Sequence, residues 1–531
     1  MKKLLSLLSI FAIVLSCSSD ETSTPVTPPP ASIAKYTITL SAGEGGTVST
    51  TGGEYESGQT VNVTATPQGE YVFASWSDGN TDATRTITVS SNSTLTANFE
   101  KRKYPLTLNF EGEGDVLEEI LSSGRSTDYD SGTKVKLTAL PSQGWEFVEN
   151  NGWDFIGWTG DIQSSDSIIT VNINEGITIT AVFEQKPFPY SINWDNLIEN
   201  VEGTSKIVYD KTLETIERNK TIDGYNNVPY KVYRGPNLDD KHYVNFDLWL
   251  DDLFGLYAKA LKPDSQTFIM FPYEDLEWAV DLLSSEEVNQ PGYETVMRNA
   301  NQNENQGVRQ NMVPNQPAGR ADGIWVLPAT LGPVVGAYES WEQHEESTLN
   351  HEYGHQAQST QWKEPDMSAP GGGMNAPCFL IEGIVTIPEL VLIFDTSDKF
   401  EQSIKGRIRG AYTSDPTTLD ELGNFTGYAP FNEEVTIDFA INYLQGSLRA
   451  NNPNCNQGLY YGLSYSMGYL ATEALVAIGG VESPMALFRL MGNKKMTWEQ
   501  AFEDIYRIPW SEAAPILAEY IYISDGIINN N

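Results

Sequence analysis

The residues that could bind a metal ion and activate water lie close together near position 350. His351-Glu352-Tyr353-Gly354-His355 places two histidines four positions apart, on one face of a helix. Two imidazoles on one face can bind the same Zn²⁺ ion. Glu352 lies at the adjoining edge, where its carboxylate would hold and deprotonate a water that the metal activates. The chain has only four histidines, so two at this spacing favour a metal site over coincidence.

A zinc site that keeps one position for water needs a third protein ligand. No histidine follows His355, so a ligand further along the chain must be a carboxylate. Glu382 stands in the apolar stretch 378–385, where an unpaired carboxylate is unfavourable unless a cation compensates it. Glu389 is the alternative ligand, weakened by the preceding Pro388, which is expected to interrupt a helix.

The strands and helices expected around the motif place it in a domain of mixed α and β structure. Residues 339–358 predict one long helix that carries both histidines. Apolar runs at 266–272 and 323–328 predict buried strands, and the polar stretch 301–316 predicts a loop between them. Backbone groups of 323–326 are then expected to pair with an extended peptide at an exposed strand edge.

The motif and the later Glu382-Gly383 together resemble the gluzincin clan of zinc peptidases, which includes thermolysin-like enzymes, aminopeptidases and bacterial collagenases. The metzincin extension is absent, because Gln358 and Gln361 stand where its Gly and His would lie. Ser359 stands where thermolysin-like enzymes have Asp, so the residue that orients either histidine is not predicted.

The resemblance implies a zincin-like α+β metallopeptidase domain over residues 187–531, with a mostly helical C-terminal subdomain. It also implies a zinc ion as cofactor and Glu352 as the general base. The implied metal ligands are His351, His355 and Glu382.

Two tyrosines are candidates for stabilising the oxyanion of the tetrahedral intermediate. The pattern Y-x-x-S-Y-x-x-x-Y-L that begins at Tyr461 resembles the helical subdomain of many gluzincins, in which a Tyr or His has that role. Tyr461 and Tyr465 are four positions apart and share a helix face, so either could serve. Each is equally well explained as a core aromatic of that helix.

Residues 35–101 and 102–186 contain one pattern twice. Tyr-x-Ser-Gly turns, alternating strands and a Phe-x-x-Trp segment that ends at Trp76 or Trp158 recur in order. This order resembles the divergent internalin-type B repeat of surface proteins from Gram-positive and Bacteroides-like bacteria. The resemblance implies two small all-β, β-grasp-like modules that act as a spacer or adhesive stalk. Both tryptophans are expected in the module cores rather than as exposed carbohydrate-binding platforms.

The N-terminus has the pattern of an export signal. Residues 1–16 combine a basic start with an apolar run too short to span a bilayer permanently. Val14-Leu15-Ser16-Cys17 resembles the lipobox of bacterial lipoproteins, which implies lipid on Cys17 and anchoring to the cell envelope. Residues 17–34 are rich in Ser, Thr and Pro and predict an extended tether.

Two cysteines and two histidines remain besides Cys17 and the motif histidines. Cys378 and Cys455 could form a disulfide in an oxidising compartment, which would tie the Glu382 segment to the tyrosine segment. His344 lies two helical turns before His351, about 10 Å along the axis, and is therefore too distant to bind the same ion. His242 has no partner that the sequence reveals.

The charge balance excludes several classes of partner. Asp and Glu number 71 against 33 Lys and Arg, a net charge of −38, so neither nucleic acid nor anionic lipid is an expected electrostatic partner. We expect an exported, lipid-anchored zinc metallopeptidase at the outer membrane, on the cell surface or facing the periplasm, with protein or peptide substrates. The alternatives are a surface adhesin or polymer-binding lipoprotein with a structural or vestigial zinc site, and a zinc amidase acting on a non-peptide amide.

Overall fold

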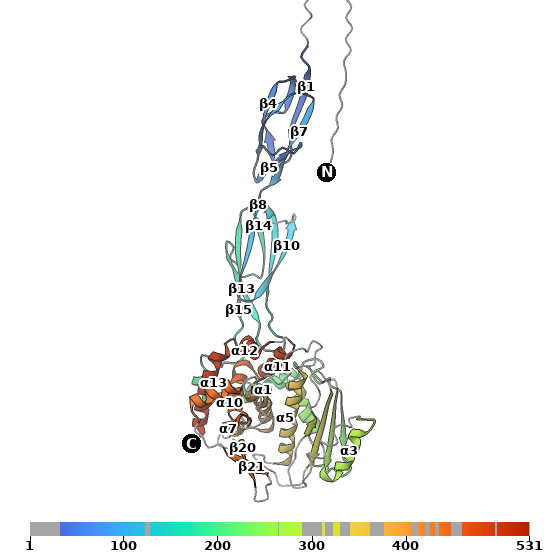
Figure 1. The fold of residues 1–531 in the computed structure, drawn as a ribbon, viewed down its shortest axis with the longest axis vertical. Coiled ribbons are helices and arrows are strands. Elements are labelled where there is room, and N and C mark those ends of the chain that lie inside the picture. Colours follow the sequence, from blue (N-terminus) through green and yellow to red (C-terminus); the bar gives the residue numbers. More distant parts are fainter. Residues whose placement is uncertain are drawn as a thin grey trace, which may run out of the picture.

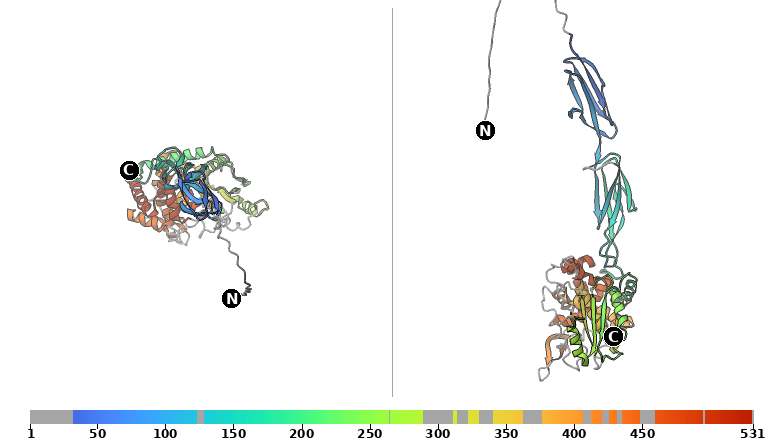
Figure 2. Two further views of the ribbon diagram at one scale, coloured as in Figure 1. Left: turned by 90° about the horizontal axis from the view of Figure 1, so that it is seen from above. Right: turned by 90° about the vertical axis from the view of Figure 1, so that its right-hand side faces the viewer.

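Two small β modules and a larger domain follow one another along the chain, and Figures 1 and 2 show them arranged end to end. The computed structural model describes residues 32–529 except 123–127, 264, 289–310, 314–321, 330–339, 362–375, 406–411, 420–424, 431–434, 448–458 and 494–495. The predicted signal peptide, Cys17 and most of the tether lie outside the described residues.

The first module contains two sheets that enclose one core. The sheets have the strand orders β3-β1-β7-β5 and β2-β4-β6, and Trp76 lies fully buried between them. Its indole N–H donates to the Asp82 carbonyl at 3.0 Å, which satisfies the one polar atom of the ring. The strands are β1 (Lys35–Ala42), β2 (Gly46–Val48), β3 (Gly52–Glu56), β4 (Thr60–Pro67), β5 (Tyr71–Trp76), β6 (Thr84–Thr88) and β7 (Ser93–Lys101).

The second module repeats this arrangement. Its sheets have the orders β10-β12-β14 and β13-β15-β9, and Trp158 is 2% exposed in the core with its indole N–H bonded to the Asp166 carbonyl. The expected core position of both tryptophans is confirmed. The strands are β8 (Lys103–Tyr104), β9 (Leu106–Glu111), β10 (Gly114–Ser122), β11 (Tyr129–Asp130), β12 (Thr133–Pro141), β13 (Trp153–Gly160), β14 (Ile168–Ile173) and β15 (Ile177–Gln185).

The β-grasp-like expectation does not describe these modules. A β-grasp sheet packs against a helix, and the described residues of both modules contain strands but no helix. Alternating residues of the two sheets in each module instead face one another and fill the core, as in a sandwich.

A four-stranded mixed sheet lies at one side of the larger domain (Figure 1). Its order is β16-β17-β19-β18; β16, β17 and β19 are parallel and β18 is antiparallel to β19. Strands β17 and β19 agree with the predicted runs, but β18 lies inside the stretch predicted as a loop. The strand bounds are β16 (Tyr230–Arg234), β17 (Ser265–Pro272), β18 (Asn311–Val313) and β19 (Asp322–Ala329).

The order of this sheet corrects the expected strand edge. Residues 323–326 belong to β19, which pairs with β17 on one side and, at 324–326, with β18 on the other, so 324–326 present no free edge. Among the described strands, β18 is the one at that end of the sheet. The polar letters of 301–316 did not reveal it because its pairing with β19 is a tertiary contact.

Helices form the rest of the domain and its core. Helix α10 is buried along its whole length, and α6 packs against both α10 and α5. The long helices are α1 (Val201–Asn219), α2 (Phe246–Leu256), α3 (Leu276–Ser284), α5 (Trp341–Thr360), α6 (Cys378–Ile393), α7 (Ser397–Lys405), α8 (Ile437–Gly446), α10 (Met467–Gly479), α11 (Ser483–Asn493), α12 (Trp498–Tyr506) and α13 (Trp510–Asn529). The short helix α9 (Leu459–Ser464) and the hairpin of β20 (Tyr412–Leu419) and β21 (Phe425–Pro430) complete it.

Helix α5 agrees with the prediction, whereas helix α6 extends further than predicted. Helix α5 is the predicted motif helix, and the Ser340 side chain caps it by accepting from the Gln343 N–H at 3.1 Å. Helix α6 continues through Pro388, although that proline was expected to interrupt it. Most of α6 is buried against neighbouring helices, and this packing stabilises a helix that contains a proline.

None of the helices in the described part of the chain is by itself long and apolar enough to cross a bilayer. The bent helix pair Gly462–Gly479 and Ser483–Gly492 reaches that length and composition only together.

Candidate metal centre

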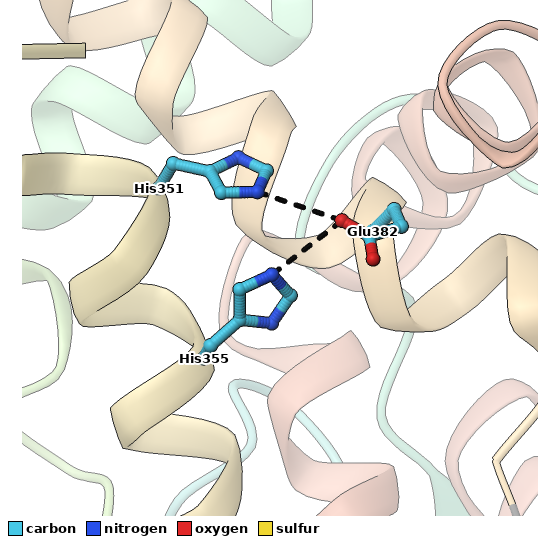
Figure 3. Close-up of side chains that lie close together, drawn as sticks. All are labelled: His351, His355 and Glu382. Atoms are coloured by element: carbon cyan, nitrogen blue, oxygen red, sulfur yellow. Dashed lines mark ion pairs between the residues drawn. The ribbon is translucent and has the colours of Figure 1, made fainter. Parts of the chain in front are cut away.

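Three predicted ligands converge between helices α5 and α6. His351 and His355 project from α5 toward Glu382 on α6 (Figure 3). The Glu382 Oε2 atom lies 3.5 Å from His351 Nε2 and 3.4 Å from His355 Nε2. The three candidate ligand atoms all lie within 4.8 Å of one another. The structure thus brings together the residues that the sequence singled out.

The donor set and its spacing fit a zinc ion. Ligand atoms about 2.0–2.2 Å from a tetrahedral ion lie roughly 3.3–3.6 Å apart, and both measured distances fall in that range. Oε2 of Glu382 is buried and has no hydrogen-bond partner. A buried carboxylate oxygen without a hydrogen bond is unfavourable, and a cation among the three residues would compensate it.

The second nitrogen of each imidazole is held by a different partner. His351 Nδ1 lies 2.9 Å from Glu389 Oε2, and the other Glu389 oxygen accepts from the Ser347 hydroxyl. His355 Nδ1 lies 3.0 Å from Gln358 Oε1, and Gln358 Nε2 donates to the Ile381 carbonyl at 2.8 Å. A proton on each Nδ1 leaves each Nε2 lone pair directed at the metal position.

These contacts answer two questions that the sequence left open. Glu389, the alternative ligand, contacts the far side of His351 rather than the ligand cluster. Glu389 and Gln358 are the orienting partners that sequence reasoning missed. The spacing of both residues could have indicated this role. Glu389 is two helical turns after Glu382, and Gln358 is three residues after His355, so each lies on the same helix face as its neighbour.

The charges around the cluster favour a cation. Burial disfavours the imidazolium form of His351, but the Glu382 and Glu389 carboxylates outweigh it and raise its pKa well above the ordinary value. The pKa of His355 is also raised, by Glu382 against the effect of burial. Burial opposes ionisation of Glu382, yet the two histidines hold its pKa well below the usual range. The same field that favours protons here favours a metal ion.

Two glycines allow the ligand helices to approach closely. A Cβ at Gly354, inside the motif, would lie 2.5 Å from Val385 Cγ1 of α6. A Cβ at Gly383, directly after the third ligand, would lie 2.1 Å from Thr472 Oγ1 of α10. Gly354 and Gly383 therefore lack a side chain at positions where α5, α6 and α10 are too close together to accommodate a Cβ atom.

The structure describes the side chains of Glu352 and Tyr465 but not that of Tyr461. Glu352 is half-buried on α5, and its carboxylate acts on both motif histidines by raising their pKa. The Tyr465 ring lies nearly parallel to the His351 ring, with centroids 6.4 Å apart. Tyr461 lies on α9, and its side chain is outside the described residues.

The other two histidines lie apart from the ligand cluster. His344 is half-buried two helical turns before His351, and burial lowers its pKa. His242 is 2% exposed, and its Nδ1 lies 2.5 Å from Glu345 Oε1. Its partner on α5 was not visible in the sequence because the contact joins distant segments.

Cys378 begins helix α6 and is disulfide-bonded. Cys455 lies outside the described residues, so its pairing with Cys378 stays a prediction.

Comparisons with known proteins identify the N-terminal part. The family model of the divergent InlB B-repeat domain matches residues 36–103 and 104–187. Both repeats belong to that family. Neither the curated proteins nor the solved structures contain a match to the chain.

Proposed function

We propose that residues 187–531 form a zinc-dependent metallopeptidase, exported and anchored by lipid on Cys17. The observation that carries the proposal is the convergence of His351, His355 and Glu382, in which the buried Oε2 of Glu382 lies 3.4–3.5 Å from both Nε2 atoms and has no hydrogen-bond partner. Two nitrogens and one oxygen leave a fourth tetrahedral position open, as catalytic rather than structural zinc sites do.

The residues of this chain have distinct roles in peptide hydrolysis. A bound zinc ion would polarise the scissile carbonyl and lower the pKa of a water molecule. Glu352 accepts the proton of that water as it attacks and delivers it to the leaving amine. Glu389 and Gln358 keep both imidazoles oriented by holding their Nδ1 atoms. Tyr465, whose ring lies beside His351, and Tyr461 are the candidates to donate a hydrogen bond to the developing oxyanion.

The sheet supplies a way to orient a peptide. Strand β18 is the end strand among the described strands of its sheet, so an extended substrate can add to it by backbone hydrogen bonds. Binding of this kind depends little on side chains, which favours protein substrates of varied sequence.

The experiment replaces the general base and leaves the ligands intact. Glu352→Gln is expected to retain zinc and to lose about 10²–10⁴ in kcat toward a peptide library, the usual contribution of a positioned base. Glu342→Gln, an exposed position on the same helix, is the matched control and should cleave at the parent rate.

Two results would oppose the proposal. Cleavage by Glu352→Gln at the parent rate would remove the mechanism. A parent protein that binds zinc and cleaves no peptide would instead favour the adhesin or the non-peptide amidase.

A further inference from the structure

The two repeats differ at one connection. In the first module residues 68–70 join β4 to β5, whereas in the second module the longer segment 142–152 joins β12 to β13. The flanking strands correspond, so 142–152 is an insertion into an otherwise repeated design. We call it the docking loop.

The apolar residues of the docking loop lie in the core of the other domain. Phe147 and Val148 are each 8% exposed and belong to the hydrophobic core of the C-terminal domain, not to that of the module that carries them. The Arg489 guanidinium of α11 lies over the Phe147 ring at 4.3 Å from its centroid. Trp145 stacks on Phe147 with centroids 5.8 Å apart. The docking loop thus anchors an aromatic pair in the helical domain.

Polar contacts surround this anchor. The Trp145 indole N–H donates to the Asp504 carboxylate of α12, and the Asn151 amide donates to the Asp504 carbonyl at 3.2 Å. Arg507 donates to the Asn150 carbonyl at 2.7 Å and to the Lys186 carbonyl. Buried apolar contacts with paired polar groups around them are typical of a permanent interface.

Two residues of this interface have an unusual backbone conformation. Asn150 and Arg507 both have positive φ, at 54° and 62°. Asn tolerates this region well, but Arg adopts it only where surrounding contacts hold it. Arg507 ends helix α12 and bonds directly to Asn150, so the interface holds both residues in place.

The anchor and the helices that carry the candidate metal ligands line one cavity. Phe147 lines a small cavity together with Tyr257, Gln361 at the end of α5 and Ile384 of α6. Ile384 is two residues after Glu382.

Tyr257 extends this contact to the H-E-x-x-H motif. The Tyr257 ring stacks on Tyr353 of the motif at 5.8 Å. Its hydroxyl is 3.0 Å from where a Cβ of Gly354 would lie. Phe147 of the docking loop, Tyr353 of α5 and Ile384 of α6 thus belong to one hydrophobic core, against which Tyr257 packs.

The joint between the two repeats is of another kind. Tyr104 donates to Glu70 at 2.7 Å, and Arg102 lies 3.9 Å from the same carboxylate, both at exposed positions. The described hydrophobic cores of the two repeats share no residue. Exposed pairs of this kind contribute little, so this joint restrains the modules weakly.

We propose that the second repeat is a structural part of the metal-binding domain, in which the docking loop stabilises the packing of α5 and α6. The first repeat is a spacer. The metal readout of this inference rests on the proposed function, but its packing readout does not.

The test compares two substitutions of apolar residues in the second repeat of the full chain. Phe147→Ala removes the anchor, and Leu117→Ala removes a side chain that is 49% exposed outside the docking loop. Hydrogen exchange of α5, α6 and α11 is expected to accelerate at least about tenfold in the first variant and to stay unchanged in the second. Exchange in the first repeat should not change in either.

Zinc release to a chelator supplies the second readout. It should be at least about tenfold faster in Phe147→Ala than in the parent. Unchanged exchange of α5 and α6 in Phe147→Ala would overturn the inference. A parent that binds no zinc would contradict the proposed function, while the exchange data would still decide this inference.

Milder variants cover the case in which Phe147→Ala does not fold. Phe147→Leu keeps an apolar side chain, and Arg507→Ala keeps the whole anchor while removing its hydrogen bonds to the docking loop. Faster exchange of α5 and α6 in both would support the inference, and parent-like exchange in both would overturn it.

Discussion

The two β repeats and the C-terminal domain place their ionisable groups differently. In the repeats the cores are apolar and the acidic and basic residues lie at the surface, as in the pair Lys136–Glu119. In the C-terminal domain Glu473 and Lys405 are buried, as is Glu389 behind the metal cluster. Burying ionisable groups is unfavourable unless partners are positioned for them. The domain with these buried groups is the one that carries the candidate metal centre.

Removing each module's core tryptophan should separate the spacer from the structural repeat. Trp76→Ala and Trp158→Ala each delete a fully packed indole and should destabilise their own module by about 3–5 kcal/mol. Only Trp158→Ala should also lower the unfolding midpoint of the C-terminal domain, because only the second repeat inserts residues there. Thermal unfolding with separate probes for each part measures this. An equal effect of both on the C-terminal domain would contradict the comparison.

Glu389, which contacts His351 Nδ1, should affect metal affinity although it is not itself a candidate ligand. Glu389→Gln keeps the size of the side chain but removes the charge behind His351, and zinc affinity should fall about 10–100-fold. Competition with a fluorescent chelator measures the change. Glu119→Gln, in the second repeat, is the control and should leave affinity unaltered. Parent-like affinity of Glu389→Gln would show that the contact does not orient the ligand.

A half-buried carboxyl group on α5 should make stability depend on pH. Burial, followed by the Asp252 and Glu342 carboxylates, raises the pKa of Glu346 to about 8 from an ordinary 4.5. The folded state therefore binds this proton more tightly than the unfolded chain, and the contribution of Glu346 to stability falls as pH rises from about 4.5 to about 8.

Replacing that carboxyl group tests the sign of the effect. Glu346→Gln should stabilise the C-terminal domain by about 1–2 kcal/mol at pH 8.5, with the difference lost near pH 5. Denaturant unfolding at the two pH values measures it. A constant difference at both pH values would mean that Glu346 does not titrate in this range.

Sequence reasoning succeeded where one local pattern determines the outcome. Alternating strands and Tyr-x-Ser-Gly turns predicted the two β repeats, and histidine spacing predicted which face of α5 carries the two histidines that meet Glu382. Glu382 was found because a lone carboxylate in an apolar stretch requires a partner.

The same reasoning failed where contacts between distant segments decide. Helix α6 continues through Pro388 because packing on α5 and α10 stabilises it, and β18 forms by pairing with β19. The docking loop contains apolar residues, but the sequence around Phe147 does not indicate that this side chain inserts into the core of another domain.

The most direct test of the central claim is zinc-edge X-ray absorption on the full chain loaded with one equivalent of zinc. Two imidazole nitrogens and one carboxylate oxygen at about 2.0–2.2 Å are predicted. Glu382→Gln should lose the carboxylate ligand, which lowers the coordination number by one, and most of the affinity. A zinc environment in the parent protein that Glu382→Gln leaves unchanged would contradict the assignment of His351, His355 and Glu382 as the metal centre.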